Sequence, residues 1–153
     1  MAAEVPGASS GERVCVVRRG DALWGVPGRH TQGIAQIEHV TRVPRTPGHL
    51  LGVSHHHGTV LAVVDLAGPL ALAAPPLEMP ALALLVEAAP LRVAVAVDEV
   101  VTFEGLEPAS RPAGSPAPAP LPFVAGRLRH ARGMVALLDV EALLAALKIR
   151  PMA

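Results

Sequence analysis

Residues 41–66, TRVPRTPGHLLGVSHHHGTVLAVVDL, constrain the fold of this chain more than any other stretch. Two glycines, Gly52 and Gly58, bracket a short segment whose backbone must either turn tightly or approach another element closely, because glycine tolerates positive φ angles. The run at 59–64 that follows is apolar and rich in β-branched residues. This composition predicts a strand that is buried on both faces and therefore lies in the interior of a β-sheet structure.

Apolar runs of similar length recur along the whole chain. They alternate with turn-forming residues, a pattern that is typical of an all-β barrel or sandwich. At 153 residues the chain has the length of one domain, or of two very small subdomains that share a core. The predicted strands span residues 13–17, 22–26, 33–39, 59–64, 81–87, 91–98, 100–104, 122–129 and 133–138.

Turn signals and proline-rich stretches set the connections between these strands. Residues 18–21, RRGD, are predicted to form a hairpin turn, and residues 88–90 a second turn. Residues 68–80 are rich in alanine and proline and are predicted to link two halves of the chain. Residues 108–122 are predicted to form a stiff surface loop, because proline lacks an amide donor and fixes φ.

Two further patterns concern packing. Residues 92–97 alternate valine with alanine, so one face of this strand is predicted to carry Val and the other Ala, as in a barrel wall with tight contacts on one side. Residues 140–147 carry apolar side chains at helical spacing after Asp139, which predicts one C-terminal helix capped by that aspartate. Leu143, Leu144 and Leu147 are expected to pack this helix on the β-structure.

Charge and cysteine content exclude several classes of function. Lys and Arg together number 13, as do Asp and Glu, so the formal net charge is zero. A chain without net positive charge matches a phosphate backbone poorly, which argues against general nucleic-acid binding. The single cysteine, Cys15, lies in an apolar run, which predicts an inert buried thiol and rules out a disulfide framework, as in cytosolic proteins. Residues 1–11 are small and polar and predict a disordered tail without a targeting segment. No apolar stretch is long enough to insert into a membrane.

Several short elements follow one another in a set order along nearly the whole chain. This order resembles the CheW family, the coupling proteins of bacterial chemosensory arrays. The resemblance implies two five-stranded SH3-like barrels side by side, an apolar seam between them, a domain over residues 12–148 and a tail at 149–153. The matching elements are Trp24-Gly25-Val26-Pro27, residues 34–40, Thr41-Arg42-Val43-Pro44 with Pro47, Gly52-Val53, Gly58, Val63-Val64-Asp65-Leu66, Val97-Asp98-Glu99-Val100, Phe123-Val124-Ala125-Gly126 and residues 137–144.

The same resemblance implies partners. In such proteins the seam takes the cytoplasmic hairpin tip of methyl-accepting receptors, and barrel surfaces pair with the regulatory domain of the histidine kinase CheA. The implied function is a non-enzymatic adaptor of a bacterial two-component system, cytoplasmic and associated with chemosensory arrays, without catalytic residues, cofactor or metal. The residues that resemble partner-binding positions of the receptor-facing seam are Thr31, Gly33, Ile34, Gly52, Val53, His57 and Gly58.

The chain departs from the family pattern at several of these positions. His57 stands where the family usually has Arg, and His55 where it has Asn. Ala67 and Gly33 likewise replace an Arg and an acidic residue that are common in the family. Arginine offers a charged, planar fork of five donors, whereas neutral histidine offers one donor and one acceptor, so a contact that used the Arg is weakened here. An accessory that binds receptor or other couplers but not the kinase is therefore an alternative function.

A small-ligand or metal sensor that uses the seam is the alternative from another class. His55 and His57 would share one face of an extended chain, giving two ligands where zinc requires three or four. Asp65 and Asp98 each end an apolar strand, which favours turn-forming or capping roles over acid–base chemistry. For the adaptor, the substitutions Ile34→Asp and Gly52→Asp are both predicted to reduce receptor binding while the fold stays intact.

Overall fold

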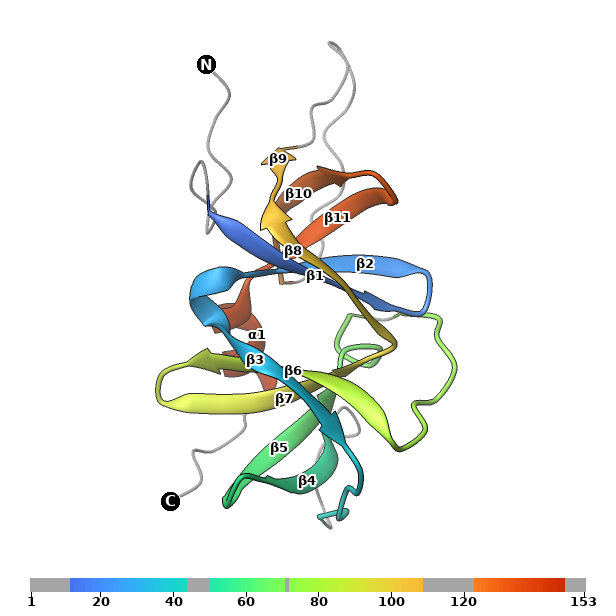
Figure 1. Cartoon of the computed structure of the whole chain (residues 1–153), viewed down its shortest axis with the longest axis vertical. Helices are drawn as coiled ribbons and strands as arrows, with labels where there is room; N and C mark the ends of the chain where they lie inside the picture. The colour runs from blue at the N-terminus through green and yellow to red at the C-terminus, as the bar shows by residue number, and fades with distance from the viewer. Residues whose placement is uncertain (1–11, 44–49, 71, 109–122, 148–153) are drawn as a thin grey trace.

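The computed structural model describes residues 12–43, 50–70, 72–108 and 123–147. The predicted tails at 1–11 and 149–153 and nearly all of the proline-rich loop lie outside these residues. Two β-sheets lie one above the other, with a short helix beside them (Figure 1). The elements are β1 (Arg13–Arg19), β2 (Ala22–Pro27), the 3-10 helix η1 (Gly28–His30), β3 (Thr31–Ile37), β4 (Leu50–His56), β5 (Thr59–Asp65), β6 (Ala81–Ala88), β7 (Leu91–Val97), β8 (Glu99–Gly105), β9 (Glu107–Pro108), β10 (Val124–His130), β11 (Gly133–Leu138) and α1 (Val140–Leu147).

The all-β prediction is confirmed. All nine predicted strands are present, and each end lies within two residues of its predicted position. Two strands, β4 and β9, were not predicted. Two histidines, a serine and a glycine give β4 a low intrinsic strand propensity, and its pairing with β5 determines its structure instead.

The strand order corrects one prediction about the chain's organisation. One sheet has the order β8-β1-β2-β11-β10-β9 and the other β3-β6-β7-β5-β4. Residues 68–80 therefore connect β5 to β6 within one sheet, and the prediction that they link two halves is wrong. Strands β3 to β7 instead form one sheet as a central block of the chain. The strands before and after this block form the other sheet, in which β11 pairs in parallel with β2.

The glycine-bracketed segment contains both a close approach and a tight turn. Gly52 has φ 147°, and a Cβ built there would lie 2.3 Å from the Thr41 carbonyl oxygen, so the backbones approach too closely for a side chain. Thr41 and Val53 exchange two backbone hydrogen bonds of 2.8 and 2.9 Å, which join the segment after β3 to β4. His57 and Gly58, both with positive φ, form the two-residue turn between β4 and β5, as hairpins of this length require.

The core confirms the packing predicted for β7. Val93, Val95 and Val97 face a large apolar cluster that also contains Cys15 and Trp24 from the other sheet. Ala94 and Ala96 face a second cluster inside the central block. The Val face therefore packs one sheet on the other, while the Ala face lets the central block close tightly.

Helix α1 completes the cluster between the sheets. The Ala142 amide donates to Asp139 Oδ1 at 3.1 Å, so the predicted N-cap is confirmed. Leu143, Leu144 and Leu147 are buried in the same cluster as Cys15, whose thiol is also buried and has its pKa raised by that burial. The predicted packing of α1 and the predicted burial of the cysteine are thus both confirmed. In the described part of the chain, no helix has the length and apolar character needed to cross a bilayer.

Candidate partner-binding surface

Three of the predicted partner-binding residues lie on β3, at the outer edge of the central sheet. Ile34 is the most exposed of them, with 55% of its surface accessible, although its cross-strand partner Leu84 is fully buried between the sheets. Thr31 donates its hydroxyl to the Pro27 carbonyl at 3.2 Å, and Gly33 adopts φ 144° with open space where a Cβ would point. The β3 edge thus exposes one large apolar side chain beside the inter-sheet core.

Two residues that the sequence did not single out extend this exposed apolar surface. Leu82 is 39% exposed and lies diagonally next to Ile34, because Leu84 is the direct partner of Ile34 on β6. Phe103 is 42% exposed on β8, opposite the buried Cys15, and so borders the inter-sheet space from the other sheet. We call Ile34, Leu82 and Phe103 the seam patch. Exposed apolar residues that adjoin a core in this way are typical of protein–protein sites.

Phe103 is held in place by its neighbours. The Arg13 guanidinium lies over its ring, 4.5 Å from the ring centroid, and Arg13 Nη2 donates to the Phe103 carbonyl at 3.0 Å. The ring also lies against Gly28 in η1, the segment that connects the two sheets. A phenylalanine near the end of an apolar strand is a weak sequence signal, and only strand pairing shows that it faces the seam.

The other predicted residues lie on the β4–β5 hairpin. Three strands separate β3 from β4 in the hydrogen-bonded order, so the seven predicted residues form two groups rather than one cluster. His57 and Gly58 are exposed at the hairpin tip, and Val53 is half-buried. Gly52 is buried against Thr41, so the expectation that Gly52→Asp leaves the fold intact is wrong: any side chain there meets the Thr41 backbone.

A buried arginine joins the two sheets next to this surface. Arg19, at the end of β1, is 1% exposed and donates to both carboxylate oxygens of Asp65, at 2.8 and 3.0 Å. It also donates to Asp98 Oδ2 at 3.2 Å, and the Gly20 amide donates to the same oxygen at 2.7 Å. The Ala67 amide donates to Asp65, which confirms a turn-forming role for that aspartate. The role of both aspartates in holding Arg19 was not predicted.

The network shifts the pKa of both partners. Burial alone would raise the pKa of the Asp65 carboxyl, but hydrogen bonds from Arg19 and Ala67 hold it below its usual value. The hydrogen bond to Asp65 raises the pKa of Arg19. The alternation of side chains along a strand could have predicted that Arg19 is buried, because Arg19 shares its strand face with Cys15 and Val17, which are both buried between the sheets.

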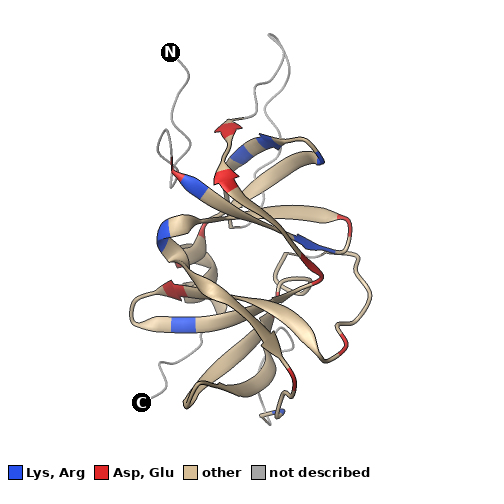
Figure 2. Cartoon of the chain, viewed as in Figure 1, with Lys and Arg blue, Asp and Glu red and all other residues tan. Residues whose placement is uncertain are grey.

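The network continues to the surface through a second set of ion pairs. Glu99 accepts from Arg18 at 3.1 Å and from Arg132 at 2.9 and 3.2 Å. The Arg132 hydrogen bonds, followed by that of Arg18, lower the pKa of Glu99. Figure 2 shows charged residues on the upper sheet and also on β6 and β7, whereas Asp65 is the one Asp, Glu, Lys or Arg residue in β4 and β5. The hairpin therefore offers a partner an almost uncharged surface.

A family comparison decides what kind of protein carries this surface. The model of the CheW-like domain matches residues 13–148, which is most of the chain. The chain belongs to the CheW-like domain family. Protein FrzA of Myxococcus xanthus is 41% identical over 49 residues, which make up 32% of this chain and 31% of FrzA. The chain thus aligns with about a third of the length of this relative.

A solved structure confirms the CheW-like fold. The scaffolding protein TtCheW from Thermoanaerobacter tengcongensis matches with a TM-score of 0.68 at 18% identity, over 84% of this chain and 88% of TtCheW. The two sheets are thus the two SH3-like subdomains of a CheW-like protein, and β9 makes the first of them six-stranded. The CheW-like family comprises coupling and scaffold proteins of chemotaxis rather than enzymes.

The histidine-rich hairpin of this CheW-like protein does not assemble a metal site by itself. His55 and His56 lie on β4 and His57 in the turn, and the His56 and His57 rings meet edge to face at 4.1 Å. Across the described residues, no group of three His, Cys, Asp or Glu side chains is placed to hold a metal ion.

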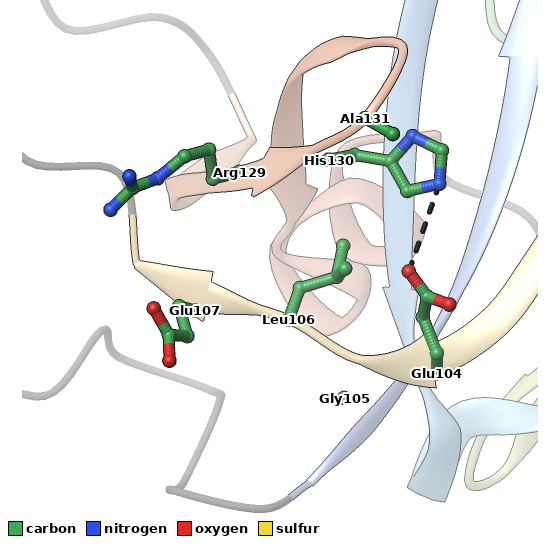
Figure 3. A pocket seen from close by; sticks show the side chains of 7 residues that line it. All are labelled: Glu104, Gly105, Leu106, Glu107, Arg129, His130 and Ala131. Carbon is green, nitrogen blue, oxygen red and sulfur yellow. Dashed lines mark ion pairs between the residues drawn. The ribbon is translucent and has the colours of Figure 1, made fainter.

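A charged hollow of 390 Å³ lies at the opposite end of the molecule, at the corner of β8, β9 and β10 (Figure 3). His130 Nε2 lies 3.7 Å from Glu104 Oε1, and the Arg132 amide donates to His130 Nδ1 at 3.0 Å. Since Nδ1 accepts that hydrogen bond, the neutral ring carries its proton on Nε2 and directs it at Glu104. Arg129 and Glu107 point away from this pair, toward solvent, in Figure 3. The hollow thus holds a contact between His130 and Glu104 beside two exposed charged side chains.

Proposed function

We propose that this CheW-like protein is a non-enzymatic adaptor that links methyl-accepting receptors to a CheA-type histidine kinase, in the cytoplasm at chemosensory arrays. The observation that supports this proposal most strongly is the seam patch. Ile34, Leu82 and Phe103 are exposed although their strand faces turn toward the core between the subdomains. Large apolar side chains that are exposed on both sheets beside this core favour a protein partner with an apolar surface, such as a receptor hairpin tip.

The β4–β5 hairpin lies apart from β3, so the proposal assigns its residues to a second partner surface instead of the receptor-facing seam. Its tip presents His57 and Gly58, and Val53 and Val60 remain half-buried on its outer face. In the proposal this hairpin pairs with the kinase regulatory domain or with a related coupler. The exposed tip is geometrically suited to such a contact, because neither turn residue is covered by the rest of the described chain.

An accessory that binds the receptor but not the kinase is the second candidate. The observation that favours it is specific: His57 and Ala67 occupy positions where the family usually carries arginine. A loss of two guanidinium groups removes charge-assisted contacts that are about twice as strong as neutral ones. Under this reading the seam patch keeps its partner and the hairpin has lost its own.

The receptor half of the proposal is tested by Ile34→Asp in a binding titration with the receptor's cytoplasmic fragment. In the complex, loss of the isoleucine's apolar contact and burial of a charge in its place should weaken binding at least about tenfold, since about 1.4 kcal/mol corresponds to that factor. Met134→Asp is the matched control, because Met134 is 57% exposed on β11, three strands from β8. Equal affinities for wild type and Ile34→Asp, with both variants folded, would remove the seam patch from the receptor contact.

A further inference from the structure

A groove of 620 Å³ lies between η1, the β6–β7 turn and α1. All three elements lie on the same side of the molecule in Figure 1. None of the residues that line the groove belongs to the seam patch or to the hairpin tip. We propose that this groove binds a lysine side chain that an apolar segment of a partner protein presents, a contact that goes beyond the receptor and kinase surfaces above.

The groove contains a buried histidine that uses only one of its ring nitrogens within the described residues. His30 is 8% exposed and lines the groove. Its Nδ1 lies 2.9 Å from the Glu87 carbonyl oxygen, and because a carbonyl can only accept, Nδ1 carries the proton. In the neutral ring Nε2 is then an acceptor, and the described residues give it no donor. A groove-lining acceptor that has no donor from the described residues favours a ligand with a donor.

The groove also carries negative charge. The carboxylates of Glu87 and Glu141 both line it, and neither forms an ion pair or hydrogen bond with another described residue. The one basic residue in the lining, Arg29, donates to both oxygens of Glu12 at 2.6 and 2.8 Å. The groove is therefore net acidic, and its free carboxylates complement a cation.

Part of the groove lining is apolar. Pro90 and Leu91 on one side and Leu144 and Ala145 on the other contribute hydrocarbon surface. A lysine carries its charge on an apolar four-carbon stem, and its ammonium has three donors for His30 Nε2 and the two carboxylates. An inorganic cation would match the carboxylates but would leave this hydrocarbon surface without a partner.

The test is an NMR titration of the full-length protein with two short peptides, acetyl-Ala-Leu-Lys-Leu-Ala-amide and the same peptide with norleucine in place of lysine. The proposal predicts that the lysine peptide shifts the amide signals of the β6–β7 turn and of α1, and that it binds at least about fivefold more tightly. Glu87→Gln and Glu141→Gln should each weaken binding about threefold, a typical value for one partly solvated charge pair. Glu78→Gln, an exposed acid before β6, should leave affinity unchanged.

Two outcomes would overturn the proposal. Equal affinity for the two peptides would show that the lysine ammonium group contributes nothing to binding in the groove. Lysine-peptide binding that occurs only in the double variant Lys148→Gln and Arg150→Gln would show that the chain's own basic residues after α1 fill the groove. Neither outcome bears on the seam patch, because the receptor titration uses residues outside the groove.

Discussion

Arg19 and Asp65 form a two-point contact between the subdomains: Arg19 Nε lies 2.8 Å from Asp65 Oδ1, and Nη2 lies 3.0 Å from Oδ2. The arginine comes from the end of β1 and the aspartate from the end of β5, so each sheet supplies one partner. A buried pair of this kind need not add stability relative to apolar residues, but losing one partner leaves the other charge uncompensated. The contact therefore fixes how the two subdomains sit beside the seam patch.

Asp65→Asn should destabilise the protein by about 3 kcal/mol, because it leaves the buried Arg19 without its main counter-charge. Urea unfolding followed by the fluorescence of Trp24 measures this directly, since the chain has one tryptophan and it lies in the cluster between the sheets. Asp21→Asn, at the exposed turn after β1, is the control and should change stability by less than about 0.5 kcal/mol. Equal unfolding midpoints for the two variants would show that the Arg19 contact does not hold the subdomains together.

The same pair predicts how stability depends on acid. The folded pKa of Asp65 lies below its unfolded value of about 3.9, so its contribution is complete above that value and is lost as the pH falls through the folded pKa. The stability difference between wild type and Asp65→Asn should therefore be constant from neutral pH to about pH 5 and shrink below about pH 4. Unfolding curves at four pH values check this, and a difference that stays the same at low pH would contradict it.

Gly52 and Gly33 provide a matched pair of substitutions. Both have φ near 145°, but a Cβ at Gly52 would lie 2.3 Å from the Thr41 oxygen, whereas nothing lies within 4 Å of one at Gly33. Gly33→Ala should show backbone strain alone, of about 1–3 kcal/mol, and Gly52→Ala should cost at least about 2 kcal/mol more. Thermal or urea unfolding of both variants gives the comparison. Similar losses would mean that the Thr41 approach is not rigid.

His57→Arg should restore a family-type contact if the hairpin tip still meets the kinase regulatory domain. His57 already occupies the left-handed region at φ 49°, so the substitution changes the side chain without demanding a new backbone. One charge-assisted contact is worth about 1.5–3 kcal/mol, so affinity should rise about tenfold or more. The substitution His55→Arg, two residues earlier on β4, serves as the control. No gain at His57 would support the accessory function instead.

Local sequence patterns predicted most of this fold, because strand and helix periodicity are local properties. The alternation at β7 and the capped helix α1 are examples in which the pattern determined both the element and its packing. Partners far apart in sequence were missed. β4 depends on pairing with β5, the parallel β2–β11 pair decides which strands share a sheet, and Arg19 gains its role only when β5 supplies Asp65.

The candidate surface shows the same division. Ile34 was found through a family resemblance, while Leu82 and Phe103 became visible only through strand register. Gly52 was identified for a partner contact, and its closest neighbour is Thr41 of the same chain. A glycine in a family motif thus indicates that another group lies close to its backbone, and only the structure shows that this group is the Thr41 backbone.

A CheW-like adaptor that connects receptor and kinase must bind both at the same time. The most direct measurement is size-exclusion chromatography of the purified protein with the receptor's cytoplasmic fragment, with the kinase regulatory domain, and with both together. The adaptor function predicts binding to each partner and a single complex that contains all three. Binding to neither partner would contradict it, and a complex with the receptor fragment alone would replace the coupling adaptor by the accessory.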